Sequence, residues 1–330
     1  QEFGLFAFIH GNLKALQPFT PDVGLLKQAL AGAWEDARQF DNWLTMEPDR
    51  QMDVAAGGDP CGRIKTWSMI QAQRGRNVLL GLEDLARAMA ELKGRKSVVL
   101  LTDGIRMRAG LNYAYALNSP RSFKGYELEH CTTYLLAEYK RMTRTFKTAN
   151  ITLSPVSMMG LVAAGPGDRN AVDELLDSSK FMAEETGGRV PLGLNDFQEA
   201  VTEAVEQPLR SYVLGFRATE STPGSAHAIE VRVNRQRVRV FARSEYVELS
   251  GDFEIDSRFS AALLFPGRDR NLQGEVSLFT LPVTGKRREL HVQVALPGEA
   301  LAWLIAAGGR RQADLQINGL LRDDRGRADE

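Results

Sequence analysis

The chain has 330 residues, of which 43% are hydrophobic and 25% are charged, a composition typical of globular proteins. Two domains are expected, because a single hydrophobic core rarely extends beyond roughly 250–300 residues. The 41 basic and 42 acidic residues leave a formal net charge of −1. A dedicated nucleic-acid-binding protein carries a basic excess, so no nucleic-acid partner is expected. No apolar run approaches the roughly 20 residues of a membrane-spanning helix, so no membrane span is expected either.

A β-hairpin is the first structure that the sequence predicts. Residues 3–9 form a short apolar run rich in aromatic residues, which is typical of a buried strand. Residues 10–12 (His-Gly-Asn) supply a turn, and a second strand is expected over 13–19. A helix follows, with Thr20 as the candidate cap and Pro21 at its first position. The expected apolar face of this helix comprises Leu25, Leu26, Ala29, Leu30 and Ala33.

The central part of the chain contains one unbroken apolar strand. Residues 40–75 show weak periodicity and predict a long excursion at one end of the sheet, either without regular structure or with a short helix. An amphipathic helix is then expected from Val78 to about Lys93. The following run, Ser97 to Thr102, ends abruptly at Asp103. Its β-branched apolar residues favour a parallel strand that is buried on both faces, in the interior of a sheet.

Helices and strands alternate over the next hundred residues. Helices are expected at about 126–147, 171–185 and 195–206, and strands at 151–156 and 189–191. This alternation predicts a Rossmann-like α/β domain over residues 1–210, with a mostly parallel sheet and helices on both faces.

The hydrophobic period changes from 3.6 to 2 after residue 210. Alternating segments lie at 212–216, 229–242, 259–265, 275–281, 290–296 and 313–321. We therefore predict an antiparallel, β-sandwich-like domain over residues 211–330. The side chains expected to turn inward are Phe259, Leu263, Val276, Leu278, Val292 and Val294.

Three groups of motifs carry a resemblance to a known family. The first joins residues 6–8 (Phe-Ala-Phe) to 16–22 (Leu-Gln-Pro-Phe-Thr-Pro-Asp), and the second is the segment 92–104, which ends in Leu-Leu-Thr-Asp-Gly. The third is 183–188 (Ala-Glu-Glu-Thr-Gly-Gly), followed by the strands that end at residues 244–246. In this order, over about residues 3–247, the chain resembles von Willebrand factor A-related proteins of the secreted bacterial type.

The resemblance implies a metal-ion-dependent adhesion site at the ends of the parallel strands. In the family, an Asp-x-Ser-x-Ser loop, a threonine and a further aspartate hold a divalent cation such as Mg²⁺. Asp103 matches the further aspartate, and Asn77 falls where the threonine is expected. The Asp-x-Ser-x-Ser segment is absent, because the chain starts at what resembles the second strand. We therefore expect an N-terminally incomplete domain that lacks its central first strand and holds no cofactor, with Mg²⁺ binding only in a complete protein.

The sequence shows no catalytic or zinc-binding motif. His10, His130, His227 and His291 are scattered, and neither a Cys-x-x-Cys nor a His-x-x-x-His pair occurs. A Gly-x-Ser-x-Gly nucleophile elbow is also missing. The two cysteines of the chain, residues 61 and 131, either pair with each other or are buried free thiols.

Three functional hypotheses follow. The first is a non-catalytic binding or adhesion module that recognises a protein partner or ligand through the loops at 40–76, 104–123 and 158–169, after the parallel strands. The second is a structural scaffold of the cell envelope that binds neither metal nor ligand. The third is a hydrolase on a similar fold, because a fold alone does not decide function. The family resemblance implies a secreted, periplasmic or envelope location.

Overall fold

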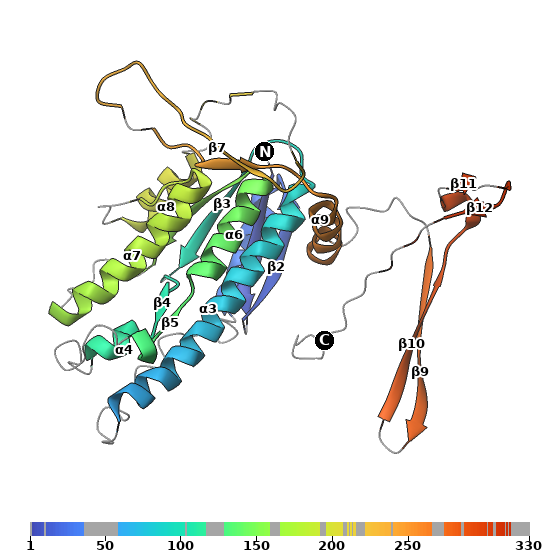
Figure 1. The fold of residues 1–330 in the computed structure, drawn as a ribbon, viewed down its shortest axis with the longest axis horizontal. Coiled ribbons are helices and arrows are strands. Elements are labelled where there is room, and N and C mark those ends of the chain that lie inside the picture. The colour runs from blue at the N-terminus through green and yellow to red at the C-terminus, as the bar shows by residue number, and fades with distance from the viewer. Residues whose placement is uncertain are drawn as a thin grey trace. The chain divides into compact units, whose positions relative to one another are not determined.

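A computed structural model of the chain divides into two compact units, Gln1–Phe265 and Pro266–Glu330 (Figure 1). None of the helices in the described part of the chain is long and apolar enough to cross a membrane. The structure describes residues 2–9, 11–35, 59–102, 104–116, 129–158, 166–191, 196–206, 210, 212, 214–215, 222–238, 240–265, 274–284, 287–301, 303–305, 308–313, 315 and 317.

The predicted N-terminal hairpin is confirmed. Strands β1 (Phe3–Ile9) and β2 (Asn12–Thr20) pair in antiparallel fashion, with Gly11 between them at a φ of 76°. Helix α1 (Val23–Glu35) follows, but Asp22 caps it instead of Thr20, because the Asp22 Oδ1 accepts the backbone N–H of Gly24 at 2.7 Å. The expected apolar face of α1 is only partly covered, since Leu25 and Leu30 are exposed.

Helix α3 starts far earlier than the sequence predicts. It runs from Pro60 to Ala90, so the second half of the expected excursion at 40–75 is helical. Asp59 caps it, accepting the N–H groups of residues 61 and 62 at 3.1 and 2.9 Å, and proline stands at the start of the first turn. The described residues of its N-terminal half that are buried are Ile64, Ser68, Ala72 and Gly75. Only one of these is a large apolar residue, and the hydrophobic period is therefore weak.

The parallel part of the fold consists of two strands in the part of the chain that the structure describes. β3 (Lys96–Thr102) and β6 (Ile151–Ser157) pair in parallel over seven residues, and no other described strand pairs with either of them. The prediction that β3 lies in the interior of a sheet is wrong among the described residues, because β3 pairs there with β6 alone. No residue of β3 is fully buried, and Leu101 is 49% exposed, because no described strand covers the second edge of β3.

Helices cover both faces of the parallel pair, as expected for a mixed α/β fold. Helices α3, α6 (Leu136–Thr148) and α7 (Pro166–Thr186) share a core with the face that carries Val98 and Leu153. Helix α8 (Phe197–Glu206) packs against Val99 and Val156 on the opposite face. The expected helix at 126–147 is interrupted before α6 by the short strand β5 (Thr133–Tyr134), and the expected strand at 189–191 is not a regular strand.

The segment that was expected to begin a second domain belongs to the first unit. Strands β7 (Ala226–Ala228) and β8 (Glu245–Val247) pair, and the predicted strand at 259–265 is instead part of helix α9 (Gly251–Leu264). Ser250 caps α9, and Phe253, Ala261 and Leu264 pack on the main core at helical spacing. The boundary between the units therefore lies after Phe265, and not after residue 210.

The second unit contains a long antiparallel hairpin. Strands β9 (Glu275–Thr284) and β10 (Arg287–Ala295) confirm the two predicted strands and pair in register, with Leu278 opposite Val292. The short elements η5 (Gly298–Ala300), β11 (Leu304–Ile305) and β12 (Arg311–Gln312) complete the described part. The expected inward packing is not observed. None of the described residues of this unit is buried, because a two-stranded hairpin cannot cover its own faces.

Candidate functional site

The structure describes only one of the two residues predicted for a metal site. Asp103 lies outside the described residues. Asn77 lies inside α3 and not before its first turn, and its side-chain carbonyl accepts a hydrogen bond from Gln73 at 3.0 Å. At the end of β3, the Thr102 hydroxyl accepts the backbone N–H of Gly104 at 3.0 Å.

These oxygen atoms do not fit a divalent cation. Mg²⁺ requires about six oxygen ligands in octahedral geometry, with one or two carboxylates among them. Among the described residues, no group of three or more histidine, cysteine, aspartate or glutamate side chains could hold a metal ion. The oxygens of Asn77 and Thr102 accept hydrogen bonds from their own segments.

We expect no heat of binding when the chain is titrated with Mg²⁺ or Mn²⁺ up to about 1 mM, because the ligand set is too small. Isothermal titration calorimetry measures this directly. Fusing an upstream strand with an Asp-x-Ser-x-Ser loop should create binding, which Asp103→Ala should then abolish. Binding by the chain alone would contradict the prediction, and so would a fused chain that binds equally well without Asp103.

A second candidate site lies beyond the carboxyl end of β3, where the N-terminal half of α3 extends past the strand (Figure 1). We call this region the α3 platform, defined as residues 60–76, 104–116 and 129–134. It contains helix α4 (Leu111–Ala116), strand β4 (Arg108–Ala109) and β5, which pairs with β4. A disulfide between Cys61 and Cys131 joins its first and last segments, so the cysteines are paired and not free.

Small buried contacts hold the three segments of the platform together. The Ser68 hydroxyl lies 2.9 Å from the carbonyl oxygen of Ala109 and 2.8 Å from the hydroxyl of Thr133. The backbone N–H of Gly110 donates to the Gln71 side chain at 2.7 Å. Gly110 has a φ of 90°, and a Cβ there would lie 2.7 Å from the Ser68 Cβ, so glycine is required at this close approach.

Helices α6 and α7 anchor the loop that follows β3. Glu174 of α7 accepts hydrogen bonds from the Arg106 guanidinium at 3.0 Å and from the backbone N–H of Arg108 at 2.9 Å. Burial raises the pKa of the Glu174 carboxyl above its usual value, although the charge of Arg106 acts in the opposite direction. The Tyr139 hydroxyl of α6 donates to the carbonyl of Ile105 at 2.6 Å. This loop is therefore part of a fixed framework.

The large exposed hydrophobic side chains of the platform come from α3 and β5. Met69 is 61% exposed and Tyr134 is 59% exposed, and Ile70 beside Met69 is exposed as well. Recognition was expected through the loops at 40–76, 104–123 and 158–169. Tyr134 lies outside all three ranges. Met69 and Ile70 fall within the first of these ranges, but they lie on a helix there, because α3 has an early start that was not predicted. The Asp59-Pro60 pair, a typical helix start, is the signal that could have revealed it.

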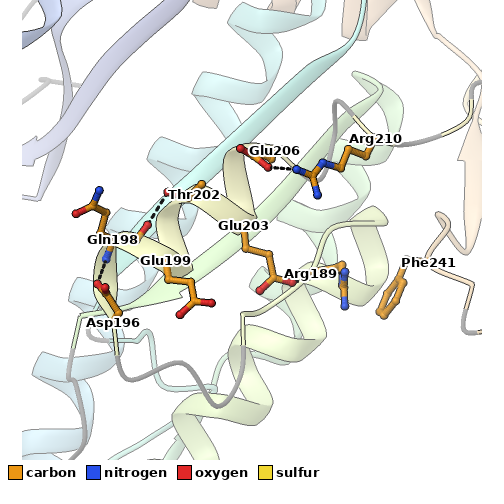
Figure 2. Close-up of a pocket in the computed structure, with 9 residues that line it drawn as sticks. All are labelled: Arg189, Asp196, Gln198, Glu199, Thr202, Glu203, Glu206, Arg210 and Phe241. Atoms are coloured by element: carbon orange, nitrogen blue, oxygen red, sulfur yellow. Dashed lines mark hydrogen bonds and ion pairs between the residues drawn. The ribbon is translucent and has the colours of Figure 1, made fainter.

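A pocket of about 820 Å³ lies alongside α8 (Figure 2). Its lining consists of Arg189, Asp196, Gln198, Glu199, Thr202, Glu203, Glu206, Arg210 and Phe241. The described lining therefore contains four carboxylates and two guanidinium groups, and no histidine, cysteine or serine.

Several charged side chains of this pocket already have partners within it. The guanidinium of Arg189 lies 3.6 Å from a carboxylate oxygen of Glu203 and 4.3 Å from the ring centre of Phe241. Arg210 forms an ion pair with Glu206 one helical turn earlier, and the Asp196 carboxylate accepts the backbone N–H of Gln198 at 2.8 Å. These contacts stabilise the start and end of α8 and point to no particular ligand.

The α3 platform is the stronger candidate, because its exposed side chains stand on a framework held by a disulfide and by buried hydrogen bonds. Comparisons of the chain with models of protein families, with curated proteins and with solved structures found no match. The function is therefore inferred from the geometry of the chain.

Proposed function

We propose that this protein is a non-catalytic module that binds a protein partner through the α3 platform. The observation that carries the proposal is the exposure of Met69, Ile70 and Tyr134 on a rigid framework. Methionine and tyrosine are enriched in protein interfaces. A framework that is already ordered also loses little conformational freedom when a partner binds, so more of the contact energy contributes to affinity.

The fold proposed for the first unit is a von Willebrand factor A-related domain. The order of its elements supports this, with a hairpin first, then a parallel pair, and helices on both faces of that pair. The platform lies at the carboxyl end of β3, which is the end where open α/β sheets usually bind their ligands.

The proposed location is an oxidising compartment, outside the cell or within its envelope. The Cys61–Cys131 disulfide supports this location, because stable disulfides are rare in the reducing cytosol of most organisms. The pair uses both cysteines of the chain, so a secreted form would carry no unpaired thiol.

Selection of binders from a random peptide library, displayed on phage against the whole chain, tests the proposal. Enriched peptides should bind the wild-type chain and lose about 30-fold or more in affinity for Met69→Asp or Tyr134→Ala. This loss corresponds to about 2 kcal/mol, the usual size of a hot-spot effect. Affinities are measured by biolayer interferometry with the synthetic peptides.

Leu80→Asp is the matched control. Leu80 is also exposed on α3 and lies on nearly the same face as Met69, about 16 Å further along the helix and outside the platform. Its substitution introduces the same charge and should leave the affinity unchanged. The proposal fails if no peptide is enriched, or if Leu80→Asp weakens binding as much as Met69→Asp does.

A further inference from the structure

The hairpin of the second unit carries apolar side chains that are exposed in the described structure. Both strands expose large apolar residues, and Leu278 is 65% exposed. The described residues of this unit contain none that is buried, so the hairpin has no core of its own. A lone two-stranded hairpin is marginal in water, whereas three or more strands form a stable sheet. Additional strands would therefore stabilise the hairpin.

The two edges of the hairpin differ in charge. β9 has one charged residue, Glu275 at its first position, and its stretch from Val276 to Thr284 is uncharged and rich in β-branched and apolar residues. β10 carries Arg287, Arg288 and Glu289 in its first three positions. Charges on an edge strand discourage pairing with another chain, and an uncharged apolar edge favours it. No described strand pairs with the second edge of β9, and this edge is therefore the better site for strand addition.

We propose that β9 is the edge through which two copies of this chain associate. The two β9 strands pair in antiparallel fashion about a two-fold axis, and the two hairpins become one four-stranded sheet. The pairing is self-complementary, because the uncharged stretch of β9 meets its own copy without like-charge repulsion. Pro282 has no N–H to donate, so the ladder is confined to residues 276–281, which contain no proline.

Sedimentation velocity of the full chain over a range of concentrations tests this association. The wild-type chain should shift with concentration towards twice its mass of 36.5 kDa. The double variant Leu278→Lys/Thr280→Lys should remain monomeric at every concentration. Both positions are exposed on one face of β9, and lysines on an edge strand prevent pairing with a second copy.

Leu290→Lys/Val292→Lys is the matched control, and it should still dimerise. These two residues are the cross-strand partners of Thr280 and Leu278. They lie on the same face of the hairpin and add the same charge to the opposite strand. Far-UV circular dichroism verifies that each variant keeps its fold.

A wild-type chain that stays monomeric overturns the proposal. So does a dimer that survives the β9 lysines. Loss of the dimer in both double variants also overturns it, because the hairpin faces and not the β9 edge would then form the contact. None of these outcomes depends on Met69 or Tyr134, so the β9 proposal and the proposed function stand or fall separately.

Discussion

Replacing Cys131 with serine is expected to lower the free energy of unfolding by about 4 kcal/mol. The Cys61–Cys131 disulfide spans 70 residues, and a cross-link of this length reduces the chain entropy of the unfolded state by about that amount. Cys131 is also buried beside Ile64 and Tyr113, where the serine hydroxyl would lose contact with water. Urea unfolding followed by far-UV circular dichroism measures the change.

Two controls separate the cross-link from other effects of the substitution. The double variant Cys61→Ser/Cys131→Ser should be nearly as unstable as Cys131→Ser, because either single change already breaks the bond. A reducing agent should destabilise the wild-type chain by a similar amount and leave the double variant unchanged. An unfolding midpoint that does not respond to the reductant would show that the disulfide does not contribute to stability.

Gly188→Ala is the second change with a large expected effect, a loss of about 3 kcal/mol or more. A Cβ at Gly188 would lie 2.0 Å from the carbonyl oxygen of Leu153 and 2.7 Å from its carbonyl carbon. Both atoms belong to the backbone of β6, so no change of side-chain rotamer relieves the contact. The chain must move away from β6 and break the hydrogen bond between Thr186 and the backbone N–H of Leu153.

Gly251→Ala is the matched control for this substitution. Gly251 lies in the first turn of α9, and a Cβ there meets nothing within 4 Å. Alanine also favours the helix over glycine by up to about 1 kcal/mol, so the variant should be as stable as the wild type or slightly more stable. Thermal unfolding of the two variants side by side decides the prediction. A similar loss in both would mean that the contact with β6 is not the cause.

The sequence alone determined the elements whose signals are local. The hairpin follows from an apolar run, a His-Gly-Asn turn and a second strand, and β3 follows from a β-branched run that stops at a polar residue. The helix expected at 195–206 is α8, which spans Phe197–Glu206. The helix expected to end at residue 185 is α7, which ends at Thr186, and the N–H of Gly188 bonds to the carbonyl of Ala183 at 2.8 Å.

Only the tertiary structure decided the features that depend on contacts between distant segments. Residues 259–265 form a short apolar run that fits a strand or a helix equally well, and packing on α3 selects the helix α9. Because α9 packs within the first unit, the boundary between the two compact units lies after Phe265 and not after residue 210. The α3 platform also depends on contacts between distant segments. The disulfide and the Ser68 contacts join segments 41 to 70 residues apart, and no local pattern encodes their proximity, because it arises only when α3 folds against the loop after β3.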